Sequence, residues 1–150
     1  MRASLPRLLA LTLATAVAGA ALPALAAPAW PGTEANAPAM GGWDPVSYFN
    51  GKPAMGDAGV TATFEGATFR FASAANRDAF AAAPARYAPQ FGGHCAWAAS
   101  QGRLSTPDPT LWKIVDGKLY LNCSKTAEAN WLADVSGNIA KGVAFWATQQ

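Results

Sequence analysis

The chain has 150 residues, 51% of them hydrophobic and only 13% charged, with 11 Lys and Arg against 9 Asp and Glu. This length suits one domain of ordinary size, and a single histidine among few charged residues leaves little material for general acid–base catalysis. No cluster of Lys and Arg gives an electrostatic footprint for nucleic acid or for an anionic membrane surface.

The first residues have the three parts of a cleavable secretion signal. A short basic stretch ends at Arg7, an apolar run covers residues 8–22, and small residues in an A-x-A arrangement end at Ala26. The apolar run is too short and too rich in alanine to predict a permanent membrane span of about 20 residues. We therefore expect residues 1–26 to be a signal peptide, the mature protein to be periplasmic or secreted, and no stable membrane anchor to remain after cleavage.

Loss of the signal changes the charge balance of the chain. Arg2 and Arg7 leave with it and no acidic residue does, so the mature chain carries 9 basic and 9 acidic residues, a net charge of 9 − 9 = 0. A neutral domain of 150 − 26 = 124 residues can build a core without obligatory staples. We expect no nucleic-acid partner, and the sequence leaves a protein partner unknown.

Composition divides the mature chain into two parts. Residues 27–42 are rich in Pro, Ala and Gly without periodicity, which predicts a flexible N-terminal segment. The domain itself is expected over residues 43–147. We expect a small single α+β domain in which antiparallel β-hairpins pack with about four short helices, without an internal repeat.

The first half of the domain predicts a strand, a hairpin and a helix. A short strand over residues 46–49 precedes a hairpin whose strands, 60–64 and 67–71, alternate bulky or β-branched residues with smaller ones. Ser73 is a candidate N-cap for a helix that Pro84 would end.

The second half predicts a helix, a hairpin and two further helices. The expected elements are a helix over residues 94–101, strands over 111–115 and 118–121 joined by the turn dipeptide Asp116-Gly117, a helix opened by Ser124, and a final helix after Ser136-Gly137. The final helix would place Ile139, Val143 and Trp146 on one face, which predicts that all three pack inward.

Several motifs, in order along the chain, resemble the YHS domain. They are Trp43-Asp44-Pro45-Val46-Ser47-Tyr48-Phe49, Thr68-Phe69-Arg70-Phe71-Ala72-Ser73, Asn76-Arg77-Asp78-Ala79-Phe80 and Pro84-Ala85-Arg86-Tyr87. The run from Trp43 to Trp146 is more closely similar to the exported YHS domain-containing proteins of bacteria. Its segments Gly92-Gly93-His94-Cys95-Ala96 and Ile114-Val115-Asp116-Gly117-Lys118-Leu119-Tyr120-Leu121-Asn122 fit that group as well.

The resemblance implies a link to copper or another soft metal, but it does not supply the metal site. Shorter YHS domains accompany copper and other heavy-metal transport proteins and resemble a cluster of three cysteines. The corresponding positions here hold Ser47, Ala72 and Asn76. A soft metal needs thiolate, thioether or imidazole ligands, so the usual site of the family cannot be carried over to this chain.

The residues with distinctive chemistry are His94, Cys95 and Cys123. The one histidine is adjacent to one of the two cysteines, just after Gly92-Gly93 and at a predicted helix start. A helix N-terminus stabilises anions, which predicts a lowered thiol pKa at Cys95. The two glycines would also let a ligand or another backbone approach closely.

Three hypotheses for the two cysteines remain open. The first is a Cys95–Cys123 disulfide, which export favours and which would close a loop of 123 − 95 = 28 residue steps. Such a loop contributes on the order of 3 kcal/mol. The second is a soft-metal site formed by Cys95, His94 and Cys123, with Met40 or Met55 as a further ligand. The third is two separate thiols, buried or reactive.

No catalytic constellation emerges from the motifs. A Ser/His/Asp order, a phosphate loop, paired catalytic carboxylates and the C-x-x-C of thiol oxidoreductases are all missing from the sequence. We expect an exported non-enzymatic binding module that binds copper or another soft metal. The alternatives are a disulfide-stabilised interaction or small-ligand-binding domain with no metal and, third, a Cys95-dependent redox enzyme.

Overall fold

Two antiparallel β-hairpins, five α-helices and four short 3-10 turns (η) make up residues 26–150, the part of the chain that the computed structural model describes. The predicted signal peptide lies outside this part, apart from Ala26. The elements in chain order are η1 (Glu34–Asn36), η2 (Ala39–Gly42), η3 (Ser47–Asn50), β1 (Asp57–Phe64), β2 (Ala67–Phe71), α1 (Ala74–Ala82), α2 (Pro84–Tyr87), η4 (Phe91–Gly93), α3 (Ala96–Ser100), β3 (Asp108–Val115), β4 (Lys118–Asn122), α4 (Lys125–Ala133) and α5 (Val135–Ala147). The predicted small α+β domain is confirmed.

Both predicted hairpins are present. β1 pairs with β2, and β3 pairs with β4, each in antiparallel register and each with an irregularity near the start of its first strand. Glu65-Gly66 and Asp116-Gly117 form the two turns, and all four of these residues have positive φ. Such a pair of left-handed residues matches the twist of a tight hairpin.

The predicted strand over residues 46–49 is wrong, because this segment is the 3-10 turn η3. The Asp44 carboxylate causes the turn: its Oδ1 accepts hydrogen bonds from the backbone N–H of Val46 at 2.8 Å and of Ser47 at 3.3 Å. A side chain that bonds backbone groups two and three residues ahead favours a turn over an extended strand.

The predicted inner face of the final helix is also wrong in part. α5 begins at Val135, before the predicted start, and Val143 is 54% exposed. The buried face instead includes Asn138 and Gly142, because the ring of Phe91 packs where a Cβ at Gly142 would lie, 2.7 Å from Phe91 Cζ. Ile139 and Trp146 are half-buried and do pack inward as predicted, so only Val143 departs from the predicted face.

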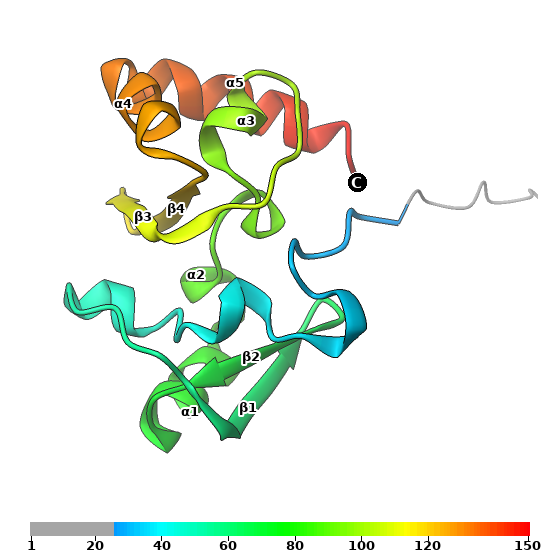
Figure 1. The fold of residues 1–150 in the computed structure, drawn as a ribbon, viewed down its shortest axis with the longest axis vertical. Helices are drawn as coiled ribbons and strands as arrows, with labels where there is room; N and C mark the ends of the chain where they lie inside the picture. Colours follow the sequence, from blue (N-terminus) through cyan, green and yellow to red (C-terminus); the bar gives the residue numbers. More distant parts are fainter. Residues whose placement is uncertain (1–25) are drawn as a thin grey trace, which may run out of the picture.

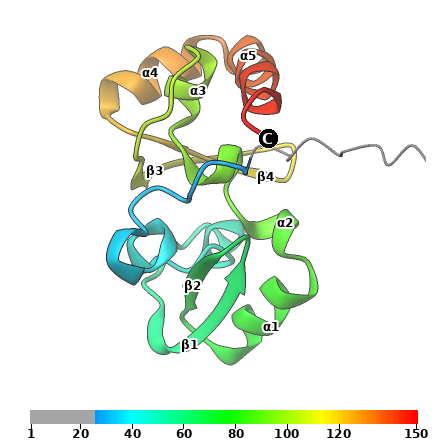
Figure 2. The ribbon, with the colours of Figure 1, turned by 90° about the vertical axis from the view of Figure 1, so that its right-hand side faces the viewer.

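The β3–β4 hairpin lies in the middle of the molecule, with the first hairpin and α1 on one side of it and α3, α4 and α5 on the other (Figures 1 and 2). Its residues Leu119 and Leu121 belong to the larger core, together with Phe69, Phe71 and Phe80. The larger core also contains Trp30, Ala39 and Met40, so the packed part of the chain extends N-terminal to residue 43. Successive residues of β4 are therefore buried on opposite faces of the same hairpin.

The chain contains an internal repeat, contrary to expectation. Residues 40–82 (the first repeat) and 91–133 (the second repeat) have the same elements, each 51 positions apart: β1 and β3 (108 − 57), β2 and β4 (118 − 67), α1 and α4 (125 − 74). The pairing register repeats as well, since Asp57 pairs with Phe71 and Asp108 pairs with Asn122. Both helices begin after a serine N-cap whose hydroxyl accepts a backbone N–H at 3.1 Å.

Side chains repeat their geometry in the same way. Phe69 and Phe80 pack with centroids 4.9 Å apart and planes at 36°, and their counterparts Tyr120 and Trp131 pack at 5.3 Å and 37°. Met40 and its counterpart Phe91 both have a φ of 57°. The described domain is thus two copies of one ββα unit that have diverged in sequence.

The two units are stacked head to tail. The outer face of the β3–β4 hairpin presents Trp112, Ile114, Leu119 and Leu121 to the core of the first repeat. The counterparts of these residues on the β1–β2 hairpin are polar, and three of the four are exposed: Thr61, Thr63, Thr68 and the half-buried Arg70. A polar outer face of this kind closes a stack of repeats, because a third unit would find no apolar surface there.

Candidate functional site

The two cysteines lie at the ends of two elements of the second repeat. Cys95 is the residue before α3, in the N-cap position, and Cys123 directly follows β4. Asn122 holds the two segments together, because its Oδ1 accepts the backbone N–H of Trp97 at 3.1 Å. The start of α3 and the end of the β3–β4 hairpin are therefore fixed side by side.

The two thiols meet in a small apolar cluster. Cys95 is fully buried, Cys123 is half-buried, and both pack with Ala98 and Ala127. Both cysteines have free thiols in this structure. Burial raises the pKa of the Cys95 thiol, and the neighbouring Cys123 side chain raises it further.

The predicted lowering of the Cys95 pKa is therefore wrong. Hydrogen bonds from the backbone at Ala98 and Trp97 do favour the thiolate, as the helix-start argument requires, but they are smaller in effect than the loss of solvent. α3 has only five residues, and its first turn cannot replace the hydration of an anion that is fully buried. Cys95 is a protonated thiol at neutral pH and a poor nucleophile.

His94 contacts Phe91 and Trp146 rather than the two thiols. Its Nδ1 lies 3.0 Å from the carbonyl oxygen of Phe91, and its ring packs against Trp146 with centroids 5.8 Å apart. A carbonyl only accepts, so Nδ1 carries the proton and Nε2 is the free acceptor of the neutral ring. Burial lowers the pKa of His94 more than the bond to Phe91 raises it, which keeps the ring neutral.

The predicted three-ligand metal site is not assembled among residues 26–150. No group of three or more His, Cys, Asp or Glu side chains in this range could hold a metal ion. Met40 is buried in the larger core, whereas Cys95 belongs to a separate cluster. Met55 is 53% exposed and pairs with Trp43 in an isolated β-bridge. Of the predicted donors, the structure brings together only the thiols of Cys95 and Cys123.

The Gly92-Gly93 dipeptide accommodates indole rings. A Cβ at Gly92 would lie 2.7 Å from Cη2 of Trp146, and a Cβ at Gly93 would lie 2.6 Å from Cε3 of Trp30. Both glycines also have positive φ. The close approach predicted for this dipeptide is therefore made by two tryptophans of the same chain.

The sequence did not reveal how the cysteines relate to the first repeat. The counterpart of Cys95 is Asp44 and that of Cys123 is Ala72 (95 − 44 and 123 − 72 both give 51). Asp44 is fully buried, and its Oδ2 accepts the N–H of Ala72 at 2.9 Å and the Nδ2 of Asn76 at 2.7 Å. A buried carboxylate thus fastens the first repeat at the same place where the second repeat has two thiols.

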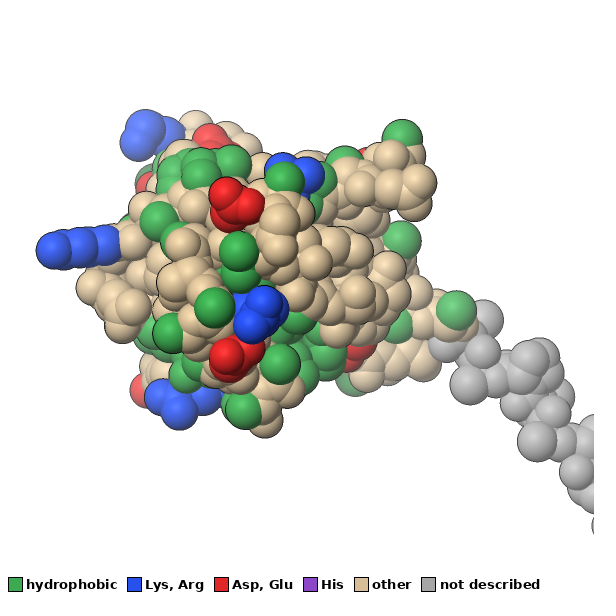
Figure 3. All heavy atoms as spheres, turned by 90° about the horizontal axis from the view of Figure 1, so that it is seen from below, with side chains coloured by type: hydrophobic (Ala, Val, Ile, Leu, Met, Phe, Trp, Pro, Cys, Tyr) green, Lys and Arg blue, Asp and Glu red, His purple; other side chains and the backbone are tan. Residues whose placement is uncertain are grey.

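The surface carries no dominant charge. Figure 3 shows Lys and Arg interspersed with Asp and Glu on one face of the molecule. No helix within residues 26–150 has the length and apolar character needed to cross a membrane. Comparisons with protein-family models, with curated protein sequences and with solved structures found no match.

Proposed function

We propose that the chain is an exported, non-enzymatic binding module whose second repeat is fastened by a Cys95–Cys123 disulfide. The observation that carries the proposal is the contact of the two thiols at the position of the Asp44 fastening in the first repeat. The signal-like N-terminus supports an oxidising destination, in which a pair of neighbouring thiols is converted to a disulfide. The motifs that resemble those of exported YHS domain-containing proteins are consistent with the same destination, and we propose that the chain belongs with them.

The formation of the bond follows from the exposure of the two sulfur atoms. Cys123 is half-buried and Cys95 is fully buried, so Cys123 is the thiol that an oxidant can reach. The Cys123 thiolate attacks the disulfide of this oxidant, which is either an oxidase with a disulfide or a small-molecule disulfide. This step forms a mixed disulfide and releases one thiol of the oxidant. Cys95 then displaces the second oxidant thiol from Cys123, and its proton passes to the departing oxidant sulfur; the closeness of the two cysteines offsets the raised pKa of Cys95. Two protein thiols are oxidised and one disulfide of the oxidant is reduced to two thiols.

Thiol titration of the denatured, unreduced protein tests the proposal. Protein recovered from an oxidising compartment should show no free thiol, and the Cys123→Ser variant should show one. Two free thiols in the unchanged protein would refute the disulfide. Mass measurement of the same sample tests export, because cleavage after Ala26 leaves a chain that begins at Ala27.

A second candidate is a two-coordinate soft-metal site between the same two sulfur atoms. The convergence of two soft donors favours it, because thiolates bind soft metals such as Cu(I). We rank it below the disulfide, because the raised pKa of Cys95 opposes the charged form that a metal ligand needs. A Cu(I) titration against a competing chelator separates the two, since binding must disappear in Cys95→Ser and must be blocked in protein that has no free thiols.

A further inference from the structure

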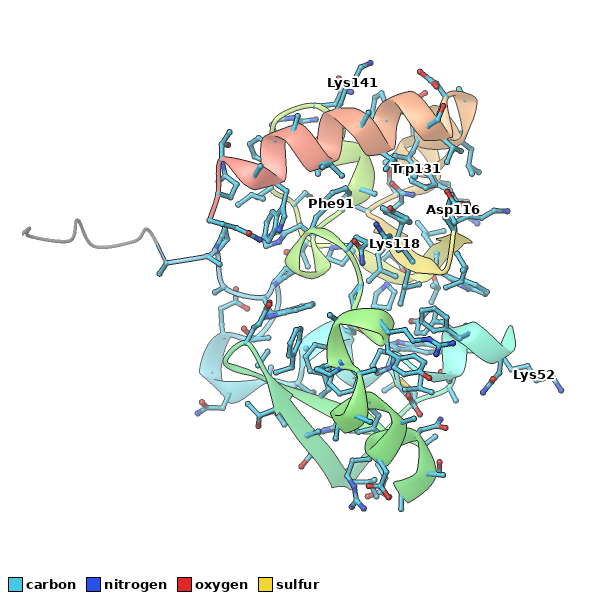
Figure 4. The ribbon with its side chains drawn as sticks, turned by 180° about the vertical axis from the view of Figure 1, so that it is seen from behind. Lys52, Phe91, Asp116, Lys118, Trp131 and Lys141 are labelled. Atoms are coloured by element: carbon cyan, nitrogen blue, oxygen red, sulfur yellow. The ribbon has the colours of Figure 1, made fainter. Side chains whose placement is uncertain are left out.

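The last helix, α5, covers the apolar side of the second repeat. Figure 4 shows Phe91 and Trp131 beneath this helix, and both rings belong to the core of the second repeat. The ring of Phe91 fills the space beside Gly142 of α5, and the indole of Trp146 fills the space beside Gly92. At each of these two places one side supplies a ring and the other a glycine. Without α5, this core would be open to water.

A single residue separates α4 from α5. α4 ends at Ala133 and α5 begins at Val135, whereas Asp134 between them has φ −149° and ψ 74°, outside the helical region. From this bend α5 runs back across the second repeat toward the end of the chain, which is marked C in Figure 1. Helical φ and ψ at Asp134 alone would join α4 and α5 into one helix over residues 125–147.

The first repeat has the same bend, and there a proline fixes it. Ala83, 51 positions before Asp134, has φ −150° and ψ 64°. Pro84 follows it, and a proline disfavours helical backbone at the residue before it and lacks the N–H that a continuous helix needs. The counterpart of Pro84 is Val135 (84 + 51), which imposes neither restriction. The bend between α4 and α5 is therefore held by other contacts.

Two polar side chains hold the bend of the second repeat. Oδ1 of Asp134 accepts the backbone N–H of Gly137 at 3.0 Å, which caps the start of α5. The Asn138 amide donates to the carbonyls of Asn130 and Trp131 at 3.3 and 3.1 Å. In a continuous helix these two carbonyls would accept the backbone N–H groups four positions ahead. Straightening thus replaces side-chain bonds by backbone bonds, and it is opposed mainly by the loss of the packing under α5.

We propose that the junction of α4 and α5 is a hinge through which two copies of this chain exchange α5. In the exchanged dimer each α5 covers the second repeat of the other copy, where it makes the contacts that it makes in the monomer. The packing lost by straightening is thereby recovered, and for this reason such an exchange is a low-cost route to a dimer. The inference goes beyond the proposed binding function, and neither cysteine lies on the hinge or on α5.

The test is to refold the purified protein at millimolar concentration and to measure the mass of the products by size-exclusion chromatography with light scattering. The unchanged protein should give a dimer beside the monomer. Asp134→Leu removes a cap that shifts a helix equilibrium by about 5-fold, so with two hinges the dissociation constant of the dimer should fall by about 25-fold. Gly137→Ala should act in the same direction, because its Cβ would overlap the Asp134 carboxylate and alanine favours a helix.

Two matched variants are the controls. Asp134→Asn should change the dissociation constant by less than about 2-fold, because asparagine also caps a helix. Val135→Pro should fold and remain monomeric, because proline suits the first position of a helix and forbids the continuous one. A dimer that Val135→Pro forms as readily as the unchanged protein would be a surface dimer and would overturn the proposal. Monomer alone, from both the unchanged protein and Asp134→Leu, would overturn it as well.

A mixed sample tests the exchange directly. Isotope-labelled and unlabelled chains are refolded together, and the dimer is isolated for NMR. Contacts between the Phe91 ring of one chain and Gly142 of the other should then be detected, because these two residues touch beneath α5. A dimer in which this contact is found only within a chain would refute the exchange.

Discussion

Substitution of Asp44 by alanine should be among the most destabilising single changes in the first repeat. The carboxylate is fully buried, and its removal leaves the backbone N–H groups of Val46 and Ala72 without a partner. Ser47 keeps a second bond, from its N–H to the Asp44 carbonyl at 3.2 Å. A buried donor left unpaired costs about 1–3 kcal/mol, and Val46 is buried whereas Ala72 is exposed, so the predicted loss is about 1–3 kcal/mol from Val46 with a smaller addition from Ala72. This is a large share of the ~5–15 kcal/mol that stabilises a typical domain.

The comparison with Asp44→Asn makes the reasoning specific. The amide retains one oxygen for Val46 but presents an N–H₂ group toward the exposed residue Ala72, so only the smaller contribution is lost and the cost should be below about 1 kcal/mol. Urea denaturation followed by tryptophan fluorescence gives the free energies of unfolding. Asp116→Asn, at an exposed turn, should change stability by less than about 0.5 kcal/mol. A loss below about 1 kcal/mol for Asp44→Ala, or equal losses for the alanine and asparagine variants, would refute the reasoning.

Three further changes test the packing, the titration and the sulfur pair. Gly93→Ala must strain a positive φ and displace the Trp30 ring, so the free energy of unfolding should fall by about 2–5 kcal/mol. Gly117→Ala, the control, has the same backbone strain but open space around it, and should lose about 1–2 kcal/mol in the same denaturation assay. The pKa of His94 is lower in the folded protein than in the unfolded chain, so the unfolded chain takes up the proton at a higher pH. The free energy of unfolding should therefore fall as the pH drops below 6.5, and it should fall less in His94→Gln. Identical pH profiles for the two proteins would contradict this. Reductant should destabilise the oxidised protein by about 3 kcal/mol, should leave Cys123→Ser unaffected, and would speak against the disulfide if it destabilised both equally.

Local signals in the sequence were sufficient for the two hairpins and for the starts of α1 and α4. Asp116-Gly117 and Glu65-Gly66 predicted the turns, and Ser73 and Ser124 predicted the caps, because these residues act on backbone atoms within a few positions. On α5, Ile139 and Trp146 pack inward as predicted but Val143 does not, because the buried part of this helix also depends on Gly142, which admits a ring from a distant segment. Periodicity alone cannot report such a contact.

The repeat was missed for a related reason. The identical residues of the two units are mostly at turns and caps, such as the glycines of η2 and η4 and the two cap serines, whereas the packed positions have diverged. Thr68 and Arg70 face outward at the positions where Leu119 and Leu121 are buried, so the hydrophobic patterns of the two hairpins differ. The two repeats have the same backbone geometry although most of their residue types differ.

The sequence identified Cys95 and Cys123 as candidate site residues, but it did not predict the direction of the Cys95 pKa shift. The sequence paired Cys95 with Cys123 as one of several hypotheses, and the structure brings them into contact. The pKa of Cys95 was predicted in the wrong direction, because its burial is produced by α4 and the end of β4, far along the chain. The desolvation of a group depends on the residues that bury it, and its neighbours in sequence do not determine which residues these are.

The central position of the β3–β4 hairpin has a consequence for the nascent chain. A polypeptide is made from its N-terminus, so Phe69 and Phe71 emerge well before Leu119 and Leu121, which cover the same core. The first repeat alone would leave an apolar surface open to water and to other unfinished chains. Although the two units are similar, the core of the first is completed only when the second hairpin packs on it.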